Sequence, residues 1–252
     1  MIHYSKSGEG NAIVLLHGFC ENSTCFDQQV FFLKQDFCVI TPDLPGVGYS
    51  EQIENTTMEK MADEVFHILE KEKITSCIML GHSMGGYVAL AFAKKFSGML
   101  KGFGLIHSTA KADDDERKIK RDQAKKVIEE KGVDFYVEQF VPPLFSTTFT
   151  DKKIINEMIA EGKRTTTAGL TAAVMAMKTR SESISFLQQT TIPALFIIGK
   201  KDLIIPDTDM FHQASLCKQA EIIYLKNAAH MGHIEEADLC AKAISDFSIS
   251  KF

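Results

Sequence analysis

The chain has 252 residues, of which 45% are hydrophobic and 24% are charged, a composition that excludes a disordered protein and predicts a sizeable buried core. Its net charge of −5 gives no sign of a nucleic-acid partner, because phosphate backbones select clustered lysine and arginine. The sequence shows no run of 18 uncharged apolar residues and no apolar leader segment. We therefore expect a cytoplasmic protein without a membrane partner.

The six cysteines show neither a CxxC pair nor the spacing of a Cys/His metal site. Four of them lie in or beside apolar runs, where a buried thiol packs well. In a cytoplasmic protein we expect reduced structural thiols, and no metal site.

Short apolar runs rich in β-branched residues alternate with helical patterns along much of the chain. Strands that are buried on both faces of a parallel sheet produce such runs. The sequence therefore predicts an α/β fold, with a mostly parallel sheet flanked by helices. The predicted strands are residues 12–16, 37–41, 77–80, 102–106, 194–198 and 221–225.

Two of the predicted helices carry local signals. Thr56 and Glu59 have the spacing of a capping box, and an apolar stripe follows them as far as Leu69. A last helix is expected to turn its apolar positions toward the sheet, namely Leu239, Ala243, Ile244 and Phe247.

From residue 108 to residue 192 the strand pattern stops, and helical stretches broken by glycine and proline follow. We predict a core domain of residues 1–107 and 193–252, with a helical cap insertion of residues 108–192. The insertion leaves the sheet where the strand 102–106 ends, so it is expected to cover that edge.

Several features of the insertion are predicted to be structural. The mixed charges of residues 111–126 indicate a solvated helix face. Arg164 and Arg180 are expected to be solvated or salt-bridged, and the methionine-rich run 173–177 to pack a helix. Apolar residues near Pro142 are expected mainly to pack the cap onto the core, with an acyl pocket as the alternative: Phe135, Tyr136, Phe140, Val141, Leu144 and Phe145.

The segment Gly81-His82-Ser83-Met84-Gly85 matches the pattern G-x-S-x-G and lies between a predicted strand and an apolar helix. In such a turn the serine adopts strained backbone geometry, and the glycines avoid collisions where the strand bends into the helix. The turn lifts the serine hydroxyl clear of the sheet. We therefore interpret Ser83 as a nucleophile.

A serine hydroxyl needs a histidine within hydrogen-bond reach and a carboxylate that holds the histidine in one tautomer. Asp202 follows the strand 194–198, and His230 follows the strand 221–225. The carboxyl ends of parallel strands share one edge of the sheet, so both side chains are expected beside Ser83. The sequence thus predicts a triad in the chain order Ser, Asp, His.

Other residues compete for these roles. Asp207 or Asp209 could replace Asp202 as the acid, and His233 competes with His230 as the base, although its position indicates a helix N-terminal turn. His17 and His82 are expected to satisfy buried backbone groups rather than to act as acids or bases.

A further element follows the first predicted strand, where Gly18 precedes Phe19. In an acyl-transfer reaction the backbone N–H groups of Phe19 and Met84 would form an oxyanion hole, which stabilises the negative charge that develops on the attacked carbonyl oxygen.

These segments together resemble the α/β-hydrolase superfamily, in particular its small capped esterases and enol-lactonase-like members. The likeness extends over nearly the whole chain and implies a sheet of seven or eight strands. A short segment before residue 12 leaves seven strands if the family's first antiparallel strand is absent. The motifs that carry it are VLLHGF at 14–19, DLPGVGYS at 43–50, GHSMGG at 81–86, IGKKD at 198–202 and AHMGHIE at 229–235.

The resemblance implies catalytic roles for Ser83, Asp202 and His230, an oxyanion hole at Phe19 and Met84, and no metal or organic cofactor. We expect a hydrolase of small-molecule carboxylic esters or lactones that works through an acyl-enzyme, as a monomer or homodimer. Two alternatives stay open because the same fold supports them: hydrolysis of carbon–carbon bonds in β-diketones, and a receptor-like protein that only binds its ligand.

Overall fold

The computed structural model describes residues 2–252, and its centre is a seven-stranded sheet in the order β1-β3-β2-β4-β5-β6-β7. All neighbouring strands are parallel except β1, which pairs antiparallel with β3. The α/β-hydrolase fold predicted from the sequence is therefore present. The strands are β1 (Tyr4–Ser7), β2 (Ala12–Leu16), β3 (Cys38–Pro42), β4 (Cys77–His82), β5 (Leu100–Ile106), β6 (Ala194–Gly199) and β7 (Ala220–Leu225).

Strand β1 is the one strand of the described sheet that was not among the predicted strands. It has four residues, YSKS, none of which is fully buried. A short polar strand at a sheet edge leaves no apolar run in the sequence, because one side of it faces solvent.

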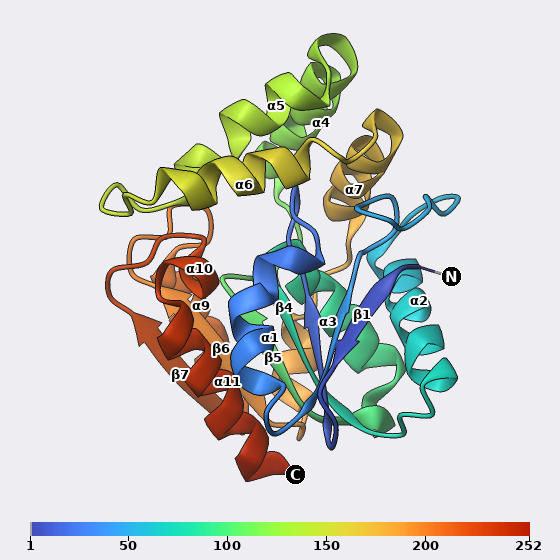
Figure 1. The fold of residues 1–252 in the computed structure, drawn as a ribbon, viewed down its shortest axis with the longest axis vertical. Coiled ribbons are helices and arrows are strands. Elements are labelled where there is room, and N and C mark those ends of the chain that lie inside the picture. Colours follow the sequence, from blue (N-terminus) through green and yellow to red (C-terminus); the bar gives the residue numbers. More distant parts are fainter. Residues whose placement is uncertain (1) are drawn as a thin grey trace.

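Helices cover both faces of the sheet (Figure 1). Helices α2 (Met58–Lys71), α3 (Met84–Lys95) and α9 (Asp207–Leu216) pack on one face, and α1 (Asp27–Leu33) and α11 (Ala237–Lys251) pack on the other. Successive residues of a strand point to opposite faces. In β2, Val14 accordingly belongs to the core under α2 and α3, and Leu15 belongs to the core under α1 and α11.

Two local predictions for these helices were wrong. The N-cap of α2 is Thr57 rather than Thr56, and its hydroxyl accepts a hydrogen bond from the N–H of Lys60 at 3.2 Å. Two adjacent threonines offer the same cap one residue apart, and the sequence alone does not choose between them. In α11, Leu239 is 55% exposed and Cys240 takes the buried position, whereas the other three predicted positions face the core.

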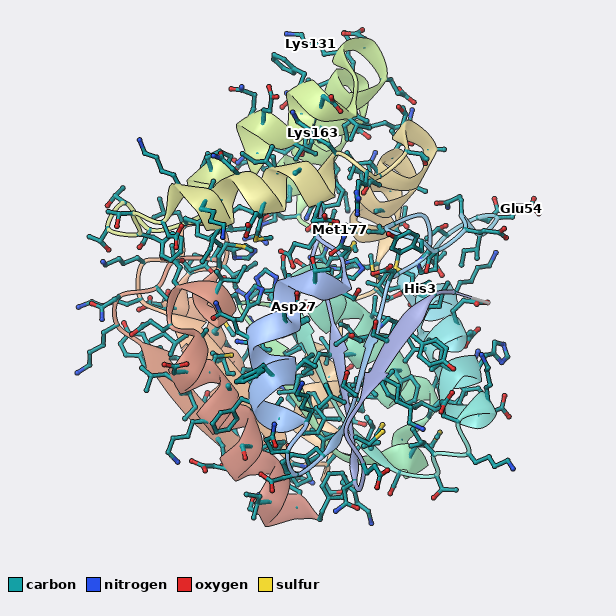
Figure 2. All side chains as sticks on the ribbon, viewed as in Figure 1. His3, Asp27, Glu54, Lys131, Lys163 and Met177 are labelled. Atoms are coloured by element: carbon teal, nitrogen blue, oxygen red, sulfur yellow. The ribbon has the colours of Figure 1, made fainter. Side chains whose placement is uncertain are left out.

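Between β5 and β6 the chain forms a run of helices, which we call the helical insertion (residues 108–192). Figure 1 shows α4 to α7 together over one end of the sheet. In Figure 2 side chains fill the space beneath these helices, with Met177 of α7 and Asp27 of α1 labelled there. The division into separate core and cap domains stays a prediction. The elements are α4 (Asp115–Lys131), α5 (Val133–Phe140), η3 (Pro142–Leu144), α6 (Lys152–Gly162), α7 (Thr167–Thr179) and α8 (Ile184–Gln189).

No helix within residues 2–252 combines the length and the apolar character that crossing a membrane requires.

Candidate active site

Ser83 lies in a sharp turn between β4 and α3. Its φ of 47° and ψ of −112° are strained for a residue with a side chain. A Cβ atom on Gly81 would collide with the backbone of Gly85, and one on Gly85 would collide with the carbonyl group of Leu16. The glycines therefore have the steric role that the motif predicted, and the serine stands at the end of β4.

The three predicted triad residues form one hydrogen-bonded line. Nε2 of His230 lies 3.0 Å from Oγ of Ser83, and Nδ1 of His230 lies 2.9 Å from Oδ2 of Asp202. The other carboxylate oxygen accepts hydrogen bonds from the N–H groups of Ile204 and Ile205, at 2.8 and 3.0 Å. With its Nδ1 proton donated to the carboxylate, His230 keeps Nε2 free to accept the hydroxyl proton.

Asp202 is buried, and burial alone raises the pKa of a carboxyl group. The positive charge that His230 can carry and the hydrogen bonds from His107 and His230 outweigh this effect and hold the pKa of Asp202 well below its usual range. Asp202 is therefore ionised at neutral pH, as the predicted acid of a triad must be.

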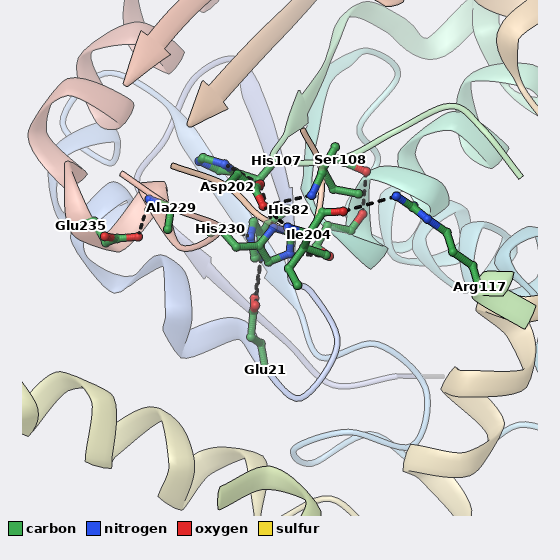
Figure 3. A network of polar contacts seen from close by, with 12 residues as sticks. Glu21, His82, His107, Ser108, Arg117, Asp202, Ile204, Ala229, His230 and Glu235 are labelled. Atoms are coloured by element: carbon green, nitrogen blue, oxygen red, sulfur yellow. Dashed lines mark hydrogen bonds and ion pairs between the residues drawn. The ribbon is translucent and has the colours of Figure 1, made fainter. Parts of the chain in front are cut away.

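Sequence reasoning missed His107, which also binds the acid. It directly follows β5 with a φ of 46°, and its Nδ1 lies 3.3 Å from Oδ2 of Asp202 (Figure 3). Burial lowers the pKa of His107 to about 4, so the ring is neutral at pH 7 and Nδ1–H donates. A Cβ atom on Gly199 or Gly232 would collide with this ring. Its position at the end of a predicted strand that neighbours the strand before Ser83 could have indicated a role in the site.

His82 and Glu21 form a buried pair on another side of His230 (Figure 3). Nε2 of His82 lies 2.8 Å from the backbone oxygen of His230, and Nδ1 lies 2.9 Å from Glu21. Burial lowers the pKa of His82, but the Glu21 charge outweighs burial and raises it. The carboxylate also accepts from the N–H of Gly18 at 2.8 Å. His82 therefore satisfies a buried backbone group as predicted, whereas Glu21 was not foreseen.

The competing candidates take other partners. Asp207 accepts a hydrogen bond from the hydroxyl of Tyr224 at 2.7 Å, and Asp209 of α9 forms an ion pair with Lys111. Neither hydrogen-bonds to His230 in the described part of the chain. His233 lies on α10 (Gly232–Glu235), where its ring packs against the ring of His82 rather than beside Ser83.

The two predicted oxyanion donors lie at the ends of two elements beside Ser83. Met84 is the first residue of α3, and the leading N–H groups of a helix have no acceptor within it. Phe19 follows β2 and lines the same cavity as Ser83. The positive end of the α3 dipole adds to the field at this position.

Ser83 and His230 line a cavity of about 330 Å³ beneath the helical insertion, which we call the Ser83 cavity. Phe19, Tyr136 and Phe140 form an aromatic wall, with the Phe19 ring 6.1 Å and 5.4 Å from the other two. Tyr136 and Phe140 were expected mainly to pack the cap onto the core, and the structure shows that they also face the cavity. The sequence did not show which way the side chains of the short helix α5 point, so it could not assign them to the cavity.

Residues 111–126 are mostly exposed or half-buried, as predicted, but the charged face of α4 also borders this cavity, which the sequence did not indicate. Arg117, Lys120 and Arg121 all line it. Lys120 and Arg121 form ion pairs with carboxylates of the insertion. The guanidinium of Arg117 instead donates to the carbonyl oxygen of Ile204 at 3.3 Å, and no carboxylate partner is found for it within residues 2–252. Arg164 and Arg180 are salt-bridged, as expected.

Comparison with known proteins agrees with this geometry. A family model described as alpha/beta hydrolase fold matches residues 11–237. The chain belongs to the α/β-hydrolase fold family. A 3-oxoadipate enol-lactonase of Acinetobacter baylyi is 28% identical over 240 residues, which cover 94% of this chain and 88% of that relative.

Solved structures of the α/β-hydrolase family superimpose on nearly the whole chain. A thermophilic esterase from Thermogutta terrifontis, solved with malate bound, has a TM-score of 0.94 and 29% identity, over 98% of this chain and 92% of its own. An enol-lactonase from Burkholderia xenovorans has a TM-score of 0.90 and 23% identity, over 98% and 95%, and shows the shared fold. The esterases and lactonases among these relatives support a hydrolase activity.

Proposed function

We propose that this protein hydrolyses carboxylic esters or lactones of small molecules through an acyl-enzyme on Ser83. The observation that supports the proposal is the continuous line from Oγ of Ser83 through both ring nitrogens of His230 to Asp202, at 3.0 and 2.9 Å. A nucleophile, a base and an acid that orients the base are thereby within reach of one another in the fold of a hydrolase family.

In this mechanism Nε2 of His230 takes the hydroxyl proton while Oγ of Ser83 attacks the carbonyl carbon. Asp202 holds Nδ1–H and stabilises the imidazolium that forms. The N–H groups of Phe19 and Met84 donate to the developing oxyanion. When the tetrahedral intermediate collapses, His230 protonates the leaving alkoxide, and the same nitrogen then activates the water that releases the acid.

The positive charge of the Ser83 cavity favours the binding of substrates that carry an anionic group away from the scissile bond. Three cationic side chains of α4 line the cavity, and no aspartate or glutamate is among the described residues that line it. Arg117 has unused N–H donors, and a guanidinium binds a carboxylate or phosphate with two parallel hydrogen bonds. A small ester or lactone with a free carboxylate fits this arrangement.

Covalent labelling tests the nucleophile. A serine-directed phosphonate or sulfonyl fluoride is expected to add one group per chain at Ser83, as located by peptide mass spectrometry, and to silence ester hydrolysis. Ser83→Ala should take no label. Labelling at another residue, together with activity that survives Ser83→Ala, would overturn the proposal.

Burst kinetics separate an enzyme from a receptor-like binder. With an activated chromogenic ester, whose acylation is faster than deacylation, we expect a burst of alcohol followed by steady turnover, because the acyl-enzyme accumulates. A pure binder would release no alcohol beyond the solvent reaction. A parallel panel of a linear ester, a lactone and a β-diketone tests the carbon–carbon alternative, which predicts turnover of the diketone alone.

A further inference from the structure

A second cavity of about 180 Å³ shares no lining residue with the Ser83 cavity. Its lining comes from the η1 turn (Ser23–Phe26) and the start of α1, from α6 and from α10. Ser83 and His230 do not line it. In Figure 2, Asp27 marks this region, at the end of α1 that faces α6.

Three different donor types converge at the base of this cavity. A carboxylate oxygen of Glu21, Sγ of Cys25 and a ring nitrogen of His233 all lie within 4.8 Å of one another. Tetrahedral bonds of about 2.0–2.3 Å to a zinc ion would place such ligand atoms about 3.3–3.8 Å apart. The three donor atoms would therefore have to move closer together to coordinate one ion.

His233 is the independent sign that this cluster has a ligand. The side chain is fully buried, and neither ring nitrogen has a hydrogen-bond partner in the described structure. A buried polar group without a partner is unfavourable, so most such groups are paired. The side-chain amide of Gln29 donates a hydrogen bond to the backbone oxygen of His233 at 2.5 Å, and the ring of Phe26 packs against the His233 ring.

The carboxylate of Glu21 retains acceptor capacity for a further ligand. Two of its lone pairs are used by Gly18 and His82, and a carboxylate has about four.

Acidic side chains surround the cluster. Asp27, Glu157 and Glu161 line the same cavity, and no lysine or arginine is among its described lining residues. Glu157 and Glu161 also form ion pairs with Lys153 and Arg164. Such an acidic lining attracts cations.

We propose that Glu21, Cys25 and His233 bind one Zn²⁺ ion, with water as the fourth ligand. Thiolate and imidazole ligands favour Zn²⁺ over Mg²⁺ and Ca²⁺, which prefer oxygen donors. On binding, the Cys25 thiol loses its proton to solvent and the sulfur forms a bond to the metal. The thiolate and the carboxylate then balance the two positive charges of the ion. None of the three ligands lines the Ser83 cavity, so the ion would lie outside the site of the proposed hydrolysis.

Cobalt titration tests this site without any use of the proposed hydrolase activity. The reduced, chelator-treated protein is titrated with Co²⁺ without oxygen, and absorption is recorded. We expect one Co²⁺ per chain, a thiolate-to-cobalt charge-transfer band, and loss of that band on addition of Zn²⁺. Cys25→Ala should remove the band and weaken Co²⁺ binding by about tenfold or more.

Two further variants make the result specific. Cys217→Ala is the matched control, because this thiol is also partly buried but lies outside the cluster, and it should keep the band. His233→Gln should weaken binding while it retains the sulfur band, and thermal unfolding checks that each variant is folded. The proposal is overturned if the parent protein binds no Co²⁺, if the band survives Cys25→Ala, if it disappears in Cys217→Ala, or if His233→Gln leaves the affinity unchanged.

Discussion

Replacing Asp202 with asparagine is expected to damage catalysis through the tautomer of His230 while the fold stays intact. Oδ1 of Asp202 accepts from the N–H groups of Ile204 and Ile205, so the amide oxygen of an asparagine will take that place. The amide NH₂ group then faces Nδ1 of His230, 2.9 Å from the present oxygen. Because NH₂ only donates, Nδ1 must give up its proton, and the proton moves to Nε2.

The size of the effect follows from that change. A protonated Nε2 cannot accept the hydroxyl proton of Ser83, and the imidazolium loses its carboxylate partner in a buried site. We expect kcat to fall by about 10² to 10⁴, which corresponds to about 3–5 kcal/mol in the barrier, with little change in KM. His107 also faces the substituted group, but as a neutral ring it can rotate or change tautomer at lower cost.

The assay is steady-state hydrolysis of a chromogenic acetate ester, with circular dichroism to verify the fold. Asp207→Asn is the matched control, because Asp207 is bonded to the hydroxyl of Tyr224 and an amide oxygen can still accept that bond. It should be nearly neutral. Near-parental kcat for Asp202→Asn, or a large loss for Asp207→Asn, would refute the assignment of Asp202 as the acid.

Three other predictions concern the same site. Ser83→Ala and His230→Ala should each lower kcat by about 10³ to 10⁶, and the double variant should cost little more, because they act as a unit; additive losses would contradict this. Arg117→Ala should reduce kcat/KM about tenfold or more for an ester with a free carboxylate relative to its neutral analogue, whereas Arg164→Ala, outside the cavity, should not; equal effects on both esters would exclude the anion role. The pKa of His107, about 4, is below its ordinary value of 6.5, so the unfolded chain binds that proton more readily and stability should fall as pH drops from 6.5 to 4. His107→Gln should flatten this slope in urea unfolding by up to about 1.4 kcal/mol per pH unit, and an unchanged slope would show that His107 does not cause it.

The sequence determined the sheet and the location of the site to a large extent. Buried parallel strands appear as apolar runs, and functional side chains follow the carboxyl ends of such strands. Ser83, Asp202 and His230 each follow a predicted parallel strand within a few residues, so their shared edge could be predicted. The turn around Ser83 could also be predicted from a short stretch of sequence, because only glycine fits at Gly85, where the backbone of Leu16 approaches.

Only the tertiary structure decided the contacts that depend on side-chain direction or on distant parts of the chain. The charged pattern of α4 does not say which face meets the Ser83 cavity, so Arg117 was assigned to solvent. His107 followed a predicted strand, yet its bond to Asp202 depends on the space left by Gly199 and Gly232.

The cluster of Glu21, Cys25 and His233 is the clearest case of contacts that the sequence does not predict. Its members have no metal-site spacing along the chain, because His233 comes more than 200 residues after the other two. They meet because the η1 turn and the short helix α10 leave different strands of the sheet and pack against each other around His82. Local sequence records neither that packing nor the absence of a hydrogen-bond partner for the His233 ring among residues 2–252, since both are properties of the folded chain alone.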